Sequence, residues 1–348
     1  MDLSAKIKGI KYQPLLGRHL EIFDFNELEN ALNSHSAFIL NINKENKLAV
    51  SWWVSAKRTR SYPYARVYDT LSFSGKKITI IPFVKDEGKD GDRDFLQWDT
   101  ISLMSLLGIY VIIAYYCDAK RSTKYRHKIT DQRFDINYVQ EQIKKILTYQ
   151  SDALHWNLEH IDKVGEIGQK AIEAYERISK KLEVEMHSLQ SAEKRIAEIL
   201  KGKENFIILS RTLAEKAQRR EKLTIQPKEK ISGTKAIITI QNYLGGYYYF
   251  TSDEVEIKGE NVFLIEGKYS KTNAIPSLED IKDGLLKMIL FTNLEDVTID
   301  NKKYNPIAVL KLTSKNYFDE NRLAANQKNM LKLLREEARI NNFQVILS

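Results

Sequence analysis

Between residues 235 and 348, short β-branched or aromatic runs alternate with longer amphipathic segments, and this alternation constrains the fold most strongly. Strands are expected over residues 235–241, 247–251, 254–258, 261–269, 306–312 and 343–347. Ser277 follows a proline and can cap a helix through Leu294. Asp319 can cap a second helix that ends near Asn341. The order hairpin, helix, strand, helix, strand predicts an α/β chain of the α+β kind, with a mixed β-sheet flanked by helices in region 206–348.

The first region, residues 1–150, mixes the same kinds of segment and is expected to form a separate α/β unit. Residues 37–42, 47–54 and 77–84 have the composition of strands. The most apolar stretch, Ile101–Tyr116, is 16 residues long and is followed at once by Asp118. It is short for a membrane span and predicts a buried helix running into a buried strand. The first 20 residues carry no signal-peptide pattern. We therefore expect a cytoplasmic protein with no membrane association.

The region 151–205 is expected to form one long helical arm. Apolar residues recur at steps of three and four from Leu154 to Ile199, and no proline interrupts them. Gly165 and Gly168 are the weak points at which the helix could bend. An arm of this kind usually packs on a partner helix or bridges the lobes of a dimer or clamp.

The chain is basic, with 54 Lys and Arg against 46 Asp and Glu and a net charge of +8. Such a balance is common in proteins that bind polyanions, although many soluble proteins are mildly basic. Three segments concentrate the positive charge: 56–68, 120–128 and 211–235. The first interleaves its cations with tyrosines and is the best candidate for DNA contact. Its candidate DNA-binding residues are Lys57, Arg58, Arg60 and Arg66.

Two acids and a lysine are expected to meet on the hairpin formed by residues 253–268. Asp253 begins one strand, and Glu266 and Lys268 lie near the end of the next, on the same face because strand side chains alternate. Paired carboxylates suit a hard divalent cation such as Mg²⁺. Glu254 directly follows Asp253 and competes with it for the role of first acid.

The acid-x-lysine spacing alone is weak evidence, because it occurs seven times, at Glu45, Glu87, Asp118, Glu256, Glu266, Asp280 and Asp300. Only Glu266 and Asp118 follow an apolar run that would form a buried strand. Asp118 and Lys120, with Asp94 or Asp99 as a second acid, therefore remain the rival site. Glu266 is favoured because a hairpin supplies its second acid and a capped helix follows it.

The run SDEVEIKGENVFLIEGKYS, followed by PSLEDIKDGLLKMILF, resembles the catalytic core of the PD-(D/E)XK nuclease superfamily, and within it type II restriction endonucleases. The resemblance covers about 115 residues from Lys235 onward. It implies that Asp253, Glu266 and Lys268 are catalytic, and that Asp253 and Glu266 bind metal with the carbonyl of Gly267 as a further ligand. Ser252 replaces the family's proline, and Glu215 or Glu221 could supply an additional acid.

The function implied by this resemblance is Mg²⁺-dependent, sequence-specific cleavage of double-stranded DNA. A homodimer and a cognate DNA methyltransferase as a functional partner are expected with it. Two alternatives stay open: a non-catalytic DNA-binding or scaffold protein with a nuclease-like fold, and a repair nuclease or junction resolvase.

Overall fold

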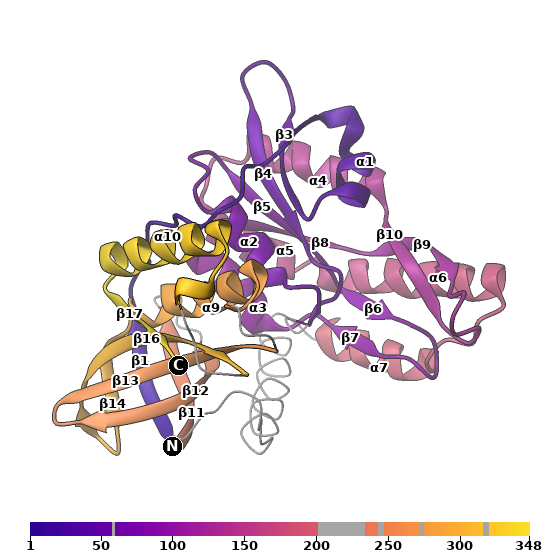
Figure 1. The fold of residues 1–348 in the computed structure, drawn as a ribbon. Helices are drawn as coiled ribbons and strands as arrows, with labels where there is room; N and C mark the ends of the chain where they lie inside the picture. Colours follow the sequence, from indigo (N-terminus) through magenta and orange to yellow (C-terminus); the bar gives the residue numbers. More distant parts are fainter. Residues whose placement is uncertain (58–59, 201–233, 243–246, 272–274, 316–319) are drawn as a thin grey trace. The chain divides into compact units, whose positions relative to one another are not determined.

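The computed structural model describes residues 1–57, 60–200, 234–242, 247–271, 275–315 and 320–348 (Figure 1). The chain divides into two compact units. One consists of Met1–His19 together with Ala214–Ser348, and the other of Leu20–Leu213. The predicted boundary near residue 150 is therefore not where the contacts divide, and the first 19 residues belong with the C-terminal region.

The unit that contains the C-terminal region is built on an eight-stranded mixed sheet with the order β15-β14-β1-β11-β12-β13-β16-β17. This confirms the predicted α+β class and mixed sheet. Its strands are β1 (Asp2–Ile7), β11 (Thr234–Asn242), β12 (Tyr247–Lys258), β13 (Asn261–Ser270), β14 (Glu295–Ile299), β15 (Lys302–Lys303), β16 (Asn305–Ser314) and β17 (Phe343–Leu347). The helices α9 (Leu278–Phe291) and α10 (Ala325–Asn341) connect its last strands.

Local sequence signals set several of these boundaries. Gly259 has φ +63° in the turn between β12 and β13, a conformation that glycine adopts without strain. Ser277 caps α9 by accepting a hydrogen bond from the Asp280 amide, as predicted. The N-cap of α10 is Ala324, whereas the predicted cap, Asp319, lies outside the described residues. Both crossovers, β13-α9-β16 and β16-α10-β17, join parallel strands.

The strand β1 completes this sheet from the other end of the sequence. It pairs parallel to β11 and antiparallel to β14. Leu3, Ala5 and Ile7 alternate with exposed residues and are buried. The period of two therefore gives β1 one core face, which the sheet covers only because residues 234–242 lie beside it.

The unit formed by Leu20–Leu213 contains a five-stranded sheet with the order β2-β3-β4-β5-β8. The strands are β2 (Ile22–Asp24), β3 (Ala37–Asn41), β4 (Lys47–Trp52), β5 (Lys77–Pro82) and β8 (Ile109–Ala114). Two small sheets add β6 (Val84–Asp86) with β7 (Arg93–Phe95), and β9 (Tyr116–Arg121) with β10 (Ile129–Phe134). Its first helices are α1 (Leu28–Ser34), α2 (Pro63–Thr70), α3 (Trp98–Leu106) and α4 (Ile136–Thr148).

The apolar stretch Ile101–Tyr116 forms part of α3 followed by β8, as predicted. Every residue of β8 is buried, which explains its continuous run of apolar side chains. None of the described helices is both long enough and apolar enough to cross a membrane.

The predicted single helix over 152–201 is wrong. The segment forms three helices, α5 (Ala153–Ile161), α6 (Val164–Leu182) and α7 (Leu189–Leu200), and α7 packs back against α6. Glu183 adopts the left-handed conformation that ends α6. Gly168 allows the close approach, since a Cβ there would lie 2.9 Å from Ile196. A stripe with steps of three and four is equally compatible with one helix or with two that face each other.

Candidate active site

An irregularity in β12 decides which acid faces the predicted partner. Ser252 pairs with Ala236 of β11, but Val255 pairs with Thr234, so two residues of β12 oppose one residue of β11. A bulge of this kind re-aims the side chains at its position. Asp253 is directed to Glu266, while Glu254 is buried and forms an ion pair with Lys311 at 3.2 Å. Asp253 is therefore the acid that the structure brings to the predicted site.

Asp253 is held by β13. Its Oδ2 accepts a hydrogen bond from the amide of Gly267 at 2.9 Å, and its carboxyl group is hydrogen-bonded to that of Glu266. Burial and the negative charge of Glu266 raise the pKa of Asp253 to about 7. The two carboxyl groups therefore share a proton near neutral pH. Gly267, predicted to offer its carbonyl to a metal, contacts Asp253 through its N–H group.

Glu266 is buried, with 2% of its surface exposed, between two ammonium groups. Its Oε2 lies 2.6 Å from Nζ of Lys287, and its Oε1 lies 3.0 Å from Nζ of Lys268. Burial favours the neutral acid, but the two lysines outweigh it and lower the pKa of Glu266 to about 2. This carboxylate is therefore ionised at neutral pH.

Lys268 lies between two acids. In addition to Glu266, its Nζ contacts Oδ2 of Asp283 at 2.7 Å. Burial acts to lower the pKa of Lys268, but the two carboxylates raise it above its ordinary value. Lys268 is consequently a fixed cation that can orient a water molecule or offset phosphate charge, and it is not poised to accept a proton.

Two residues of this cluster were missed from the sequence, and both lie on α9. Asp283 and Lys287 are one helical turn apart and face β13. Lys287 also donates a hydrogen bond to the carbonyl of Thr251 at 3.2 Å. The available signal was a lysine inside the apolar run LLKMILF, because a lysine buried in such a run normally has an acidic partner.

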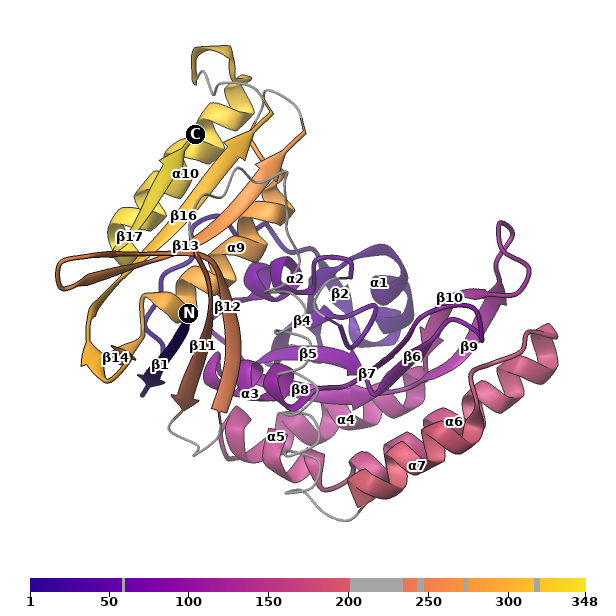
Figure 2. The ribbon, with the colours of Figure 1, turned by 90° about the horizontal axis from the view of Figure 1, so that it is seen from below.

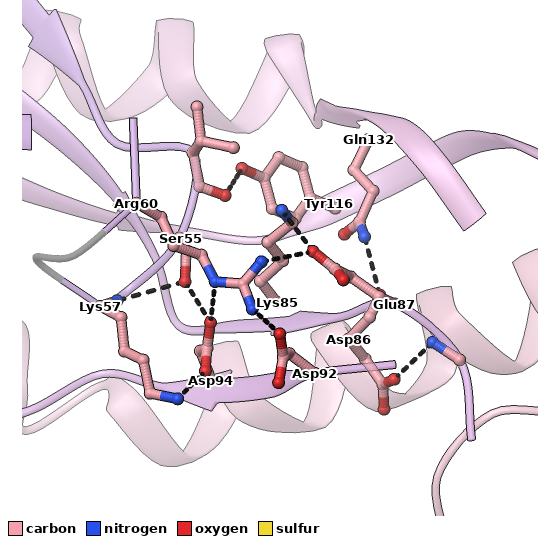
Figure 3. Close-up of polar contacts among 12 residues, drawn as sticks. Ser55, Lys57, Arg60, Lys85, Asp86, Glu87, Asp92, Asp94, Tyr116 and Gln132 are labelled. Carbon is pink, nitrogen blue, oxygen red and sulfur yellow. Dashed lines mark hydrogen bonds and ion pairs between the residues drawn. The ribbon is translucent and has the colours of Figure 1, made fainter. Parts of the chain in front are cut away.

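The predicted DNA-binding cations have internal partners. Arg60 contacts Glu87, Asp92 and Asp94, and Lys57 contacts Asp94 at 2.6 Å (Figure 3). Together these residues join the segment after β4 to β6, β7 and the loop between them. Of the four predicted cations, Arg58 lies outside the described residues.

Arg66 is enclosed by the segment after β4. Its guanidinium group lies 4.4 Å from the ring centroid of Trp52 and donates a hydrogen bond to the Trp52 carbonyl. Burial lowers the pKa of Arg66 to about 10. DNA contact by the 57–66 cluster remains a prediction, and Arg66 is badly placed for it.

The rival site is not assembled among the described side chains. Asp118 forms an exposed ion pair with Lys181, Lys120 pairs with Asp131, and Asp94 is buried against Lys57 and Arg60. Details of the Asp99 side chain, and the candidate acids Glu215 and Glu221, lie outside the described residues.

No family model, curated protein or solved structure matches this chain. Within the described residues, no group of three or more His, Cys, Asp and Glu side chains is arranged to hold a metal ion. A metal at Asp253 and Glu266 would therefore rely on two carboxylates, backbone oxygen and water. Oxygen donors of this type suit Mg²⁺, which keeps several water ligands in proteins.

Proposed function

We propose that this chain is a Mg²⁺-dependent endonuclease that hydrolyses double-stranded DNA at Asp253, Glu266 and Lys268. The observation that supports it most is the bulge in β12, which sets Asp253 against Glu266 beside a fixed lysine. Two carboxyl groups that share a proton offer an oxygen-rich position at which a divalent cation can replace that proton. The hairpin followed by a capped helix agrees with the resemblance to PD-(D/E)XK nucleases.

In this proposal each residue has a distinct role. Asp253 and Glu266 would hold the ion, which supplies Lewis acidity at the scissile phosphate and a lower pKa for a bound water molecule. Lys268, fixed by Glu266 and Asp283, would orient the attacking water or balance charge on the phosphate. Asp283 acts through Lys268, whose ammonium group it holds in place. Sequence specificity, a homodimer and a methyltransferase partner belong to the same proposal.

The test is cleavage of supercoiled plasmid DNA by the full chain in the presence of Mg²⁺. We expect Glu266→Gln and Lys268→Met each to lower the cleavage rate by at least roughly a hundredfold, since each removes charge at the reacting phosphate. The matched control is Glu256→Gln, which removes an acid of the same hairpin that pairs only with exposed Lys258. Undiminished cleavage by Glu266→Gln or Lys268→Met would show that this site is not catalytic.

One observation favours the non-catalytic alternative. Lys287 and Lys268 already neutralise Glu266, so the cluster is compensated without a metal. A DNA-binding protein with an inactive nuclease-like fold would gain no stability from Mg²⁺. A thermal shift with and without the ion separates the two functions, because an ion that binds the folded state raises the melting temperature. The proposed nuclease requires a shift that Asp253→Asn removes.

A further inference from the structure

The connection between β9 and β10 concentrates exposed positive charge. The eight residues 121–128, RSTKYRHK, contain four cations and no acid. Lys124 and Arg126 are exposed, and neither forms an ion pair with any residue that the structure describes. By contrast, the neighbouring Lys120 pairs with Asp131. Figure 2 shows this connection projecting beyond the two strands. We name residues 121–128 the basic ribbon.

The basic ribbon is internally braced. Ser122 and Lys128 are joined by a backbone hydrogen bond of 2.9 Å, and Nε of Arg121 donates to the carbonyl of Arg126 at 2.8 Å. The Tyr125 amide donates to the hydroxyl of Ser122 at 3.1 Å. Bracing of this kind reduces the conformational entropy lost on binding, so the cations are presented in a largely preformed arrangement.

An aromatic ring lies between two of the cations. Tyr125 is 47% exposed, and Nζ of Lys124 and of Lys128 lie 5.4 and 5.6 Å from its ring centroid. Tyr125 is also the only large apolar residue of the basic ribbon. A surface that combines mobile-counterion displacement with one exposed ring fits a nucleic acid better than a lipid surface, which would favour several apolar side chains.

We infer that the basic ribbon binds the phosphate backbone of double-stranded DNA by entering the major groove. This inference rests on the proposed function, for which duplex DNA is the substrate. The major groove of B-form DNA is about 12 Å wide and admits a two-stranded β-ribbon, whereas that of A-form RNA is too narrow for side chains to read. Lys124 and Arg126 contact phosphates, and Tyr125 packs against the sugar and base edges. This surface is distinct from the 57–66 cluster, in which the described cations face acids or backbone carbonyls.

The chain offers a matched control at another hairpin. The turn between β3 and β4 carries Lys44 and Lys47, both exposed, beside Glu45. The double variants Lys124→Ala/Arg126→Ala and Lys44→Ala/Lys47→Ala therefore remove the same charge from two turns of one unit. A difference between them measures position and not net charge.

The experiment measures binding of the full chain to a fluorescent DNA duplex, by anisotropy, in EDTA over a series of salt concentrations. For Lys124→Ala/Arg126→Ala we expect at least about tenfold weaker binding and a slope of log K against log salt that is smaller by about two. For Lys44→Ala/Lys47→Ala we expect binding within roughly twofold of the unmodified chain and an unchanged slope. Equal affinities and slopes for the two double variants would overturn the inference.

Competition identifies the ligand class. Unlabelled DNA duplex should displace the labelled duplex, whereas duplex RNA or vesicles that contain phosphatidylserine should do so only weakly. Displacement by RNA or vesicles at least as strong as by DNA would overturn the inference. Cleavage assays with Glu266→Gln keep the two proposals apart. If that variant cuts normally while the ribbon variant binds poorly, the nuclease site fails and the ribbon stands. If it does not cut while the ribbon variant binds normally, the ribbon alone fails.

Discussion

Glu266 keeps its charge inside the protein because two lysines compensate for the loss of water. Isolated burial of a carboxylate is costly, and a buried ion pair is stable only when its geometry satisfies both partners. Lys287 meets that condition with contacts to Glu266 and to the carbonyl of Thr251. The cluster is consequently sensitive to the loss of one member, and stability and activity can be tested on different residues.

Replacing Lys287 by methionine keeps the aliphatic volume but removes the closer of the two cations at Glu266. We expect a loss of about 3–5 kcal/mol in the free energy of unfolding, because the carboxylate would lose its main partner in a buried site. Urea denaturation measures this loss. The control is Lys258→Met, which breaks an exposed pair with Glu256 and should cost less than about 1 kcal/mol. Similar losses for both variants would contradict the account of Glu266.

The pKa of Asp253 predicts a pH dependence. Its value of about 7 in the folded state exceeds the unfolded value of about 4, so the folded chain binds an extra proton between these limits. The stabilisation is complete below about pH 4 and is lost as pH rises through 7. Asp253→Asn should therefore gain stability relative to the unmodified chain, on the order of 2–4 kcal/mol, between pH 4 and pH 8.

This difference is measured by urea unfolding in EDTA at a series of pH values. Asp90→Asn, which changes an exposed acid, is the control and should follow the unmodified chain at every pH. Parallel curves for Asp253→Asn and the unmodified chain would mean that Asp253 has an ordinary pKa in the folded state.

The sequence predicted part of this cluster. Asp253, Glu266 and Lys268 were found because strand periodicity and a glycine turn fix neighbours across a hairpin. The choice between Asp253 and Glu254 could not be made, since it depends on a bulge relative to β11, a strand that is not part of that hairpin. Lys287 was missed because its partner lies 21 residues away and depends on how α9 packs on the sheet.

The helix α9 determines how closely the sheet side of the cluster is covered. Gly284 faces β13 and β16, and a Cβ there would lie 2.7 Å from Cδ1 of Leu310 and 3.1 Å from Cε of Lys268. Only a residue without a side chain permits this approach. The spacing of α9 from β13 therefore contributes to the position of the Lys268 ammonium group.

Gly284→Ala separates helix propensity from packing. Alanine favours the helix by about 1 kcal/mol, but its methyl group must displace Leu310 or Lys268. We expect the DNA cleavage rate to fall at least about tenfold through displacement of Lys268, because misplacement by about an ångström is costly in catalysis. Adding Leu310→Val makes room and should restore part of the rate. A single variant that cleaves normally would show that Lys268 tolerates the shift.

Periodicity was a good guide to individual elements and a poor one to how they end. The predicted strands in 235–269, 306–312 and 343–347 correspond to β11, β12, β13, β16 and β17. The turn between α6 and α7 was missed because residues 183–188, EVEMHS, contain neither glycine nor proline. Glu183 accepts the left-handed conformation there because packing of α7 on α6 compensates for the local strain.

At the scale of the whole molecule, the two ends of the sequence share one sheet. The segment that follows β1 is also fixed to α10, since Glu337 accepts hydrogen bonds from Tyr12, Leu15 and Leu16. No pattern within residues 1–20 could predict that partnership, because a single strand gives no information about its neighbours. The domain boundary placed at residue 150 failed for that reason.

Ile7 provides a test of this shared sheet. It is 1% exposed, and Ile7→Ala should lower the free energy of unfolding by about 2–5 kcal/mol. The control Ile22→Ala alters a residue that is 56% exposed and should change stability by less than about 0.5 kcal/mol. Hydrogen exchange locates the effect. Ile7→Ala should accelerate exchange in β11 and β14, and unchanged exchange in both strands would contradict the pairing.

The pairing of β1 with β11 also orders events at the ribosome. Translation proceeds at about 5–20 residues per second, so residues 234–242 emerge roughly 10–50 seconds after residues 2–7. During that interval the Leu3, Ala5 and Ile7 side chains have no sheet to join, while Leu20–Leu213 can already collapse around its own core. An unpaired apolar strand on a nascent chain is a substrate for chaperones and a template for misassociation. Synthesis of this protein therefore depends on keeping its earliest segment unengaged until one of its last elements has been made.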